Sequence, residues 1–158
     1  MLRVGEGYDV HRLVEGRPFR LGLIEIDHDR GPLGHSDGDA VAHALCDALF
    51  GAAALGDIGT HFSPRDERWK DADSAAFVRA AAAMLDEHGW TVVNVDITVV
   101  TERPRLAPHI ASMRAALAAA LGCDVERVSV KAKTAEGLGE IGRNEAIEAR
   151  CVALVESG

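Results

Sequence analysis

Aromatic residues and cysteines are scarce in this chain, and basic residues are outnumbered by acidic ones. Aromatics make up only 4% of the 158 residues while apolar residues reach 47%, so the core must be built mainly from Ala, Val, Leu and Ile. With 17 basic against 25 acidic residues the net charge is -8, which opposes non-specific attraction to nucleic acid or anionic membranes. We therefore expect no nucleic-acid or membrane partner. Any phosphate ligand must be attracted locally, by metal ions, helix N-termini or a few placed cations.

The cysteines Cys46, Cys123 and Cys151 lie far apart and outside any CxxC spacing. This pattern argues against a disulfide framework and against a thiolate zinc site. No uninterrupted apolar stretch approaches the length that crosses a bilayer, and no basic segment followed by an apolar run opens the chain. The sequence therefore predicts a soluble, unprocessed protein of the cytoplasm.

The length fits one domain spanning residues 1–158. Apolar periodicity and turn residues predict a β-hairpin of residues 2–10 and 19–26, helices at 40–56, 74–89 and 104–122, strands at 91–101, 127–133 and 146–156, and an exposed loop at 59–71. This order predicts an α/β sandwich of one mixed β-sheet with helices on one face. Because two strands alternate with small or apolar residues on their second face, we expect another subunit to cover that face.

Histidines and aspartates gather in "GYDVHR" and "HSDGDAVAHALCDALFG". Asp9 and His11 are two residues apart in a predicted strand, so they project from the same face and can chelate one ion. His43, on the predicted helix, can supply a third ligand, and His35 is a rival for that role. Two nitrogens, one carboxylate and an open fourth position are typical of catalytic zinc. From spacing alone, an ordinary carboxylate and a surface histidine explain the strand pair equally well.

Two further aspartates flank His43 by one helical turn. Asp39 and Asp47 lie at i-4 and i+4, so either could orient the imidazole from behind. Asp37 or Asp39 could instead cap the helix N-terminus.

A glycine-rich segment, "KAKTAEGLGEIGR", contains several cations, a threonine and a carboxylate. Lys131, Lys133, Thr134 and Arg143 could cradle a phosphate, with Glu136 available for magnesium or manganese. Taken alone the segment is weak support, because glycine-rich loops are usually plain turns. The stretch "TERPRLAPHI" similarly offers free amides near a helix start, although a plain start of a helix explains it equally simply.

Five motifs occur in a characteristic order: "GYDVHR", "HSDGD" followed by "HAL", "ALGDIGTHF", "TERPRLAPHI" and "KAKTAEGLG". In this order and spacing the sequence resembles the 2-C-methyl-D-erythritol 2,4-cyclodiphosphate synthase family of the non-mevalonate isoprenoid pathway, over nearly the whole chain. The resemblance implies a homotrimer with sheets packed around a central axis and active sites between neighbouring subunits.

The resemblance also implies roles for individual residues. Asp9, His11 and His43 would hold zinc, Glu136 a second ion, magnesium or manganese, and His35 and Thr134 would stabilise the transition state. Substrate phosphate would contact His35 and Ser36, and the substrate would also contact Asp9, Val10 and His11. The erythritol part would contact Asp57, Ile58 and Gly59, with Phe62 and Asp66 nearby. The cytidine part would contact Thr101, Arg105, Leu106 and Ala107. The phosphates would contact Lys133, Ala135, Glu140 and Arg143.

The implied activity is a phosphorus-oxygen lyase reaction. The 2-phosphate of 4-diphosphocytidyl-2-C-methyl-D-erythritol 2-phosphate attacks its own β-phosphorus, forming the cyclodiphosphate and releasing CMP. An alternative is a zinc-dependent phosphodiesterase acting on a nucleotide-type substrate, and a non-enzymatic alternative is a metal-dependent assembly module. The sequence departs from the family at Glu140, at "GRNEAI" and at "HFSPRD". An added carboxylate at position 140 could weaken phosphate binding, and we expect Glu140 to pair with Arg143 instead.

Overall fold

The computed structural model describes all residues, 1–158. The strands are β1 (Leu2–Glu15), β2 (Phe19–Leu21), β3 (Ile24–Ile26), β4 (Arg30–Pro32), β5 (Trp90–Val100), β6 (Val128–Lys133) and β7 (Ala146–Ser157). The helices are α1 (Ala40–Ala53), α2 (Ile58–His61), α3 (Ser74–Glu87), α4 (Ile110–Leu121) and α5 (Gly139–Gly142), with 3-10 turns at η1 (Glu67–Trp69), η2 (Ala107–His109) and η3 (Val125–Arg127).

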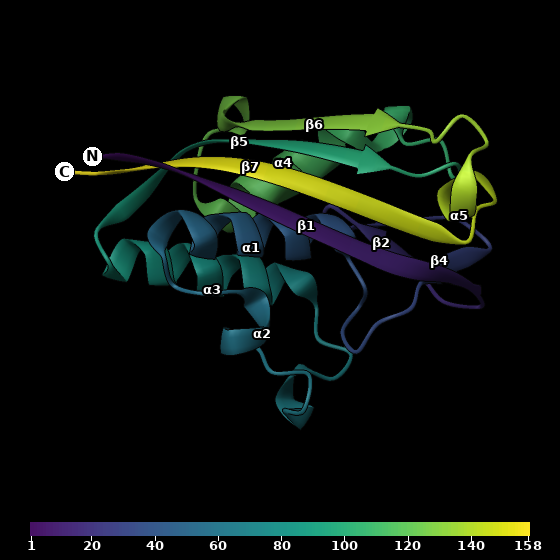
Figure 1. Ribbon diagram of the computed structural model, residues 1–158, viewed down its shortest axis with the longest axis horizontal. Coiled ribbons are helices and arrows are strands. Elements are labelled where there is room, and N and C mark those ends of the chain that lie inside the picture. Colours follow the sequence, from purple (N-terminus) through teal and green to yellow (C-terminus); the bar gives the residue numbers. More distant parts are fainter.

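The main sheet has five strands in the order β4-β1-β7-β5-β6 (Figure 1). Strands β5 and β6 are parallel and are joined through α4, whereas the other neighbours are antiparallel. Helix α1 contacts β1 and β7, α4 contacts β6, and α3 contacts both α1 and α4. The expected mixed α/β architecture is therefore confirmed.

The predicted hairpin of residues 2–10 with 19–26 is wrong. Strand β1 continues to Glu15 and pairs with β7 over Leu2–Arg12 and with β4 over Leu13–Glu15. Residues 19–26 instead fold on themselves, as β2 paired with β3. The long alternating strand β7 offers β1 a longer ladder than residues 19–26 could. The β2–β3 turn is held elsewhere, because the Asp39 carboxylate accepts hydrogen bonds from the backbone of Gly22 and Leu23.

One helix start and three short helical elements also differ from the sequence-based expectation. The helix predicted from residue 104 begins only at Ile110, after the 3-10 turn η2. Pro108 lies in the first turn of η2, where its missing N–H breaks no helical hydrogen bond. The predicted loop at 59–71 contains α2 and η1, and residues 139–142 form the unpredicted one-turn α5.

The core lies between the sheet and the helices and consists mostly of Ala, Val and Leu, as the low aromatic content indicates. Along β7 every second residue from Ile147 to Val155 is buried. The opposing residues of β1 include Gly5 and Gly7, which face the backbone of α1. A Cβ atom at Gly7 would overlap the carbonyl oxygen of Ala44, and one at Gly5 would overlap that of Ala48. The two glycines therefore allow α1 to lie directly on the strand.

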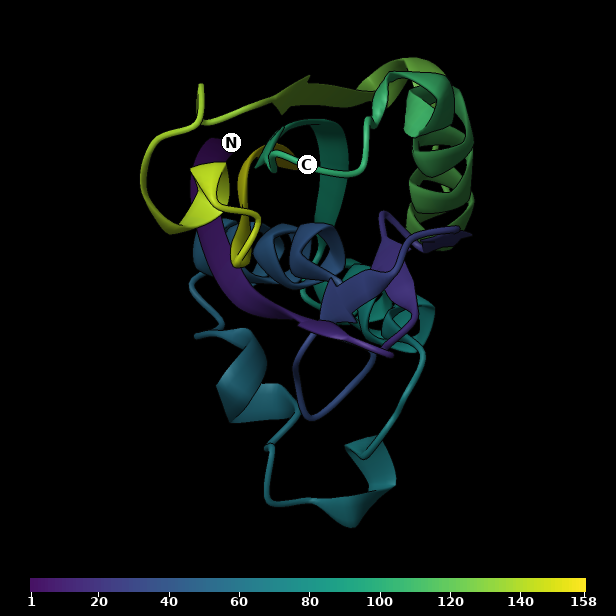
Figure 2. The ribbon, with the colours of Figure 1, turned by 90° about the vertical axis from the view of Figure 1, so that its right-hand side faces the viewer.

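The long helices α1, α3 and α4 lie on one side of the sheet and leave most of the other face uncovered (Figure 2). Large apolar side chains are exposed there along two adjacent strands: Leu2, Val4, Tyr8, Val10 and Val152. Scattered apolar residues are ordinary on protein surfaces, but exposed apolar residues gathered along two neighbouring strands make this face a candidate for contact with another subunit. No helix of the structure combines the length and the apolar character needed to span a bilayer.

We predict that Gly7→Ala destabilises the fold by about 3 kcal/mol or more, because α1 must move off β1 to admit the methyl group. Thermal or urea denaturation followed by circular dichroism measures the loss. Gly51→Ala is the matched control, since Gly51 is exposed in α1 and a Cβ there meets only the Glu6 oxygen at 3.9 Å. An unchanged stability for Gly7→Ala would contradict the close-approach argument.

Candidate metal centre and substrate pockets

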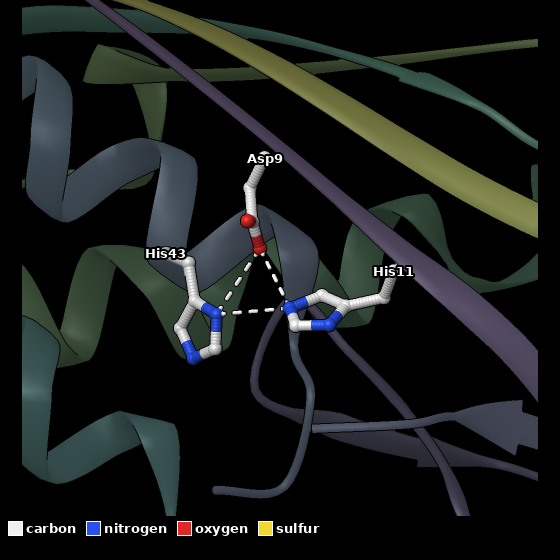
Figure 3. A group of neighbouring side chains, drawn as sticks. All are labelled: Asp9, His11 and His43. Atoms are coloured by element: carbon white, nitrogen blue, oxygen red, sulfur yellow. Dashed lines mark hydrogen bonds and ion pairs between the residues drawn. The ribbon is translucent and has the colours of Figure 1, made fainter. Parts of the chain in front are cut away.

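Asp9, His11 and His43 converge at the junction of β1 and α1 (Figure 3). The Asp9 Oδ2 lies 2.8 Å from His11 Nε2 and 3.1 Å from His43 Nδ1, and the two imidazole nitrogens are 3.2 Å apart. A tetrahedral ion with bonds near 2.0 Å would set its ligand atoms roughly 3.3 Å apart. The three atoms therefore fit one metal ion after a small outward adjustment, and the two-nitrogen, one-oxygen donor set suits a divalent transition metal.

Charge reinforces this arrangement. Burial by itself would raise the pKa of Asp9, but hydrogen bonds from His11 and His43 outweigh it and hold the pKa below its usual value. Burial by itself would lower the pKa of His11, but the hydrogen bond and charge of Asp9 outweigh it and raise the pKa. The carboxylate thus favours positive charge at this point of the fold. A metal cation would replace the imidazole proton there.

His11 is oriented by the backbone, since its Nδ1 lies 2.9 Å from the carbonyl oxygen of Leu33. That contact directs Nε2 toward the centre. For His43 the expectation that Asp39 or Asp47 orients the ring is wrong. Its Nε2 instead lies 3.1 Å from the hydroxyl of Ser36 and 3.3 Å from that of Ser74.

The two aspartates flanking His43 serve the backbone instead. Asp39 caps α1 by accepting from Ala42 N–H at 3.0 Å, which confirms one of the two predicted caps, and it also holds the β2–β3 turn. Burial is the largest influence on Asp39 and raises its pKa, although three backbone donors oppose that rise. Asp47 accepts from the N–H of Ile58 at 2.7 Å and so fixes the start of α2.

A pocket of about 250 Å³ opens beside the three candidate ligands. His35 is exposed and lines this pocket, but it is not part of the group that could hold a metal, so its rival role as third ligand is not supported. Of the residues implied by family resemblance, the pocket brings together His11, His35, Ser36, His43, Ile58, Gly59 and Phe62. Asp57 caps the adjacent α2, and Asp66 caps η1.

A second pocket, of about 200 Å³, lies at the end of β5 and β6. It is lined by Thr101, Glu102, Pro104, Arg105, Leu106, Ala107, Ala132, Lys133 and Thr134. The neighbouring Ala135 donates its N–H to Glu102 at 3.3 Å, and Glu136 donates its N–H to the Thr134 hydroxyl at 3.2 Å. The pocket shares no residue with the one beside the metal ligands. Strands β1 and β6 are separated by two others, which at about 4.8 Å per strand places them roughly 14 Å apart.

The departures from the family pattern include the exposed Glu140 and the half-buried Asn144 and Ala146. Glu140 is exposed and its carboxylate is 3.7 Å from the Arg143 guanidinium, which agrees with the expected pairing with that arginine. Arg143 pairs more closely with Glu145, at 3.2 Å, and this pair lowers the pKa of Glu145. Glu140 also lines a small pocket with Val10 and His11.

Sequence reasoning missed several residues of the site. Ser74 is fully buried against His43, and the aromatic rings of Trp69 and Phe77 line the metal-side pocket. The "DADS" segment before α3 indicates a helix start, but no local pattern shows that this start lies against another helix.

Comparison with known proteins agrees with this geometry. A sequence model of the YgbB family matches residues 2–156. This chain belongs to the YgbB family of 2-C-methyl-D-erythritol 2,4-cyclodiphosphate synthases. The synthase of Chromobacterium violaceum is 59% identical over 98% of both chains, and that of Dechloromonas aromatica is 58% identical over 98% of this chain and 96% of the relative.

Solved structures show the same fold. A synthase structure in its CDP-bound form has a TM-score of 0.90 at 38% identity, covering 98% of this chain and all of that one. The bifunctional IspDF from Campylobacter jejuni has a TM-score of 0.96 at 37% identity, covering all of this chain but only 43% of the bifunctional protein. As a member of this family the chain is an enzyme, and the family assignment made from its motifs is confirmed.

We predict that His11→Ala or His43→Ala abolishes stoichiometric zinc binding while the fold is retained, because a metal site that is open to ligand is not what stabilises the folded chain. Zinc content after dialysis, measured by atomic emission, and circular dichroism check the two parts. His88→Ala is the control, because His88 is exposed and its ring contacts only the carbonyl of Met84. Variants that unfold, or that keep full zinc, would refute the assignment.

Proposed function

We propose that this enzyme converts 4-diphosphocytidyl-2-C-methyl-D-erythritol 2-phosphate to 2-C-methyl-D-erythritol 2,4-cyclodiphosphate and CMP, in the cytoplasm. An oxygen of the 2-phosphate forms a bond to the β-phosphorus, and the bond from that phosphorus to the oxygen bridging it to the α-phosphate breaks. The bridging oxygen leaves with CMP, so no water is consumed. The observation that carries the proposal is the convergence of Asp9, His11 and His43 beside a pocket, in a chain 59% identical to a named synthase.

Asp9, His11 and His43 are the residues that would hold a divalent ion, with zinc suited to their donor set. The carboxylate of Glu136, exposed after β6, would hold magnesium or manganese together with substrate diphosphate. Such ions, when bound, screen negative charge and polarise the phosphoryl group that is attacked.

The chain's own contribution is mainly positioning. The substrate carries its own nucleophile, which agrees with the absence of a serine or cysteine nucleophile pattern in the sequence. Holding two reacting groups in line can remove roughly 7–11 kcal/mol from a barrier. His35 and Ser36 at the metal-side pocket would hold the attacking phosphate, while Thr134 and Lys133 in the second pocket would hold the diphosphate.

The remaining substrate contacts divide between the two pockets. Thr101, Arg105, Leu106 and Ala107 line the second pocket as a base site would, with Ala135 and Arg143 farther along the chain. The other contacts lie near the metal-side pocket or near β1: Val10, Asp57, Ile58, Gly59, Phe62, Asp66 and Glu140. A solved relative bound to CDP supports a cytidine site in the family.

Assembly as a homotrimer would unite the two pockets. Within one chain they share no residue, and strands β1 and β6 beside them are separated by two other strands. The exposed apolar residues of β1 and β7 supply a face for subunit contact. A trimer with sheets packed around a common axis would set the metal-side pocket of one subunit against the second pocket of its neighbour.

The alternative activity, zinc-dependent phosphodiester hydrolysis, uses the same three ligands but needs water. The relatives bear the synthase name, which supports cyclisation over hydrolysis.

We predict that the purified enzyme releases CMP from the diphosphocytidyl substrate and forms a cyclic product whose mass equals substrate minus CMP. High-resolution mass spectrometry of the reaction decides, because hydrolysis would add the mass of one water. Chelator should stop CMP release, and added zinc with magnesium should restore it. A linear product would overturn the proposed reaction in favour of the phosphodiesterase.

We further predict that two inactive variants, His43→Ala and Thr134→Ala, complement each other when they are mixed, dissociated and reassembled. If each site combines halves of two neighbouring subunits, about one quarter of the sites in randomly mixed rings are intact. CMP release should therefore recover to roughly that fraction of wild-type activity. The same mixture without dissociation is the control, and no recovery after reassembly would contradict a shared site.

A further inference from the structure

The imidazole of His43 has its two nitrogens in different surroundings. Its Nδ1 faces Asp9 and His11, whereas its Nε2 points away from them, toward the hydroxyls of Ser36 and Ser74. A neutral imidazole that binds an ion through the Nδ1 lone pair must carry its proton on Nε2. The group that accepts the hydrogen bond from this N–H therefore fixes the tautomer and the orientation of the His43 ring for metal binding.

Ser74 is prepared to accept it. Its hydroxyl donates a short hydrogen bond to Asp37 Oδ1, and its backbone N–H donates to Asp37 Oδ2 at 2.8 Å. With its only hydroxyl hydrogen directed at a carboxylate, Ser74 Oγ can only accept at His43 Nε2, 3.3 Å away. The Ser36 hydroxyl contacts only His43, so it can rotate and either donate or accept.

Asp37 is itself held in place. Its Oδ1 accepts from the N–H of Asp39 at 3.1 Å, its own N–H donates to Ala72, and the guanidinium of Arg20 lies 4.0 Å from Oδ2. It also lies against the first residue of α3, where the helix dipole favours negative charge. Ser74 is completely buried, so water cannot replace its hydroxyl.

We propose that Ser74, supported by Asp37, is a positioning residue for the metal-binding His43. The contacts run in series from the Asp37 carboxylate to the Ser74 hydroxyl to the His43 imidazole, which would bind the ion. The negative charge of Asp37 therefore polarises the Ser74 hydroxyl, which in turn makes it a stronger acceptor for the His43 N–H. Carboxylate partners of metal-bound histidines act in this way when they contact the ring directly. This inference rests on the proposed metal centre at Asp9, His11 and His43.

The test is zinc affinity, measured by competition with a chromophoric chelator, together with the absorption spectrum of the cobalt-substituted protein. Ser74→Ala should weaken zinc binding by about tenfold or more. It should also alter the cobalt spectrum, because the orientation of His43 changes. Asp37→Asn keeps the shape of the side chain but removes its charge, and it should also weaken zinc binding. This variant provides the test if Ser74→Ala does not fold.

Asp73→Ala is the matched control. Asp73 caps the same turn of α3 by accepting from Ala75 N–H at 2.9 Å and lies 3.5 Å from the Arg20 guanidinium, but it has no hydrogen bond to Asp37, Ser74 or His43. Its loss should perturb the helix start and leave zinc affinity and the cobalt spectrum unchanged. If Asp73→Ala weakened zinc binding as much as Ser74→Ala, the effect would be one of helix stability and the proposal would be overturned.

Two further outcomes separate this inference from the proposed function. A wild-type protein that binds zinc tightly and a Ser74→Ala variant that binds it equally, with the same cobalt spectrum, would overturn the role of Ser74 alone. A wild-type protein that binds neither zinc nor cobalt would overturn the metal centre itself and this inference with it.

Discussion

The contact between β1 and α1 is the constraint on which the metal centre depends. Gly5 and Gly7 present no side chain to α1, so the carbonyl oxygens of the helix lie where a Cβ would otherwise be. Asp9 follows Gly7 on the same face of the strand, and His43 precedes Ala44, the residue that covers Gly7. Their ligand atoms lie 3.1 Å apart as a direct result. Metal coordination tolerates displacements of only about 0.2 Å, so a looser fit between strand and helix would separate the ligands.

Holding α1 in place requires the burial of a carboxylate, which is unfavourable. Asp39 is fully buried, and burial raises its pKa, which means that its ionised form is less favourable in the folded protein than in water. Three backbone N–H groups offset part of that cost: Ala42 in the first turn of α1, and Gly22 and Leu23 in the β2–β3 turn. One carboxylate thereby fixes both the start of the helix and the hairpin that covers it.

The parts of this molecule that local patterns encode were predictable from the sequence, and those that depend on distant partners were not. Strands 91–101 and 146–156 and helix 74–89 follow from periodicity, and the spacing of Asp9 and His11 indicates a shared face. The partner of β1 could not be inferred, because alternation does not specify which of several alternating strands completes the ladder. The expectation that Asp39 or Asp47 orients His43 was wrong for a similar reason, since helical spacing shows which residues share a face but not which backbone amides lie opposite it. Ser74 became visible as part of the site only when α3 was placed against α1.

The charge distribution explains how an acidic chain can suit a phosphate-rich substrate. The net charge of -8 repels polyanions at long range, so attraction must arise within the pockets. The metal-side pocket is built on one carboxylate and two imidazoles, so a bound divalent cation leaves it net positive. Arg105 and Lys133 supply positive charge in the second pocket, where Glu102 is occupied by the backbone of Ala135. Both positive regions are small and lie on strands roughly 14 Å apart in one chain, so a ligand that uses both at once rests on the proposed assembly of subunits.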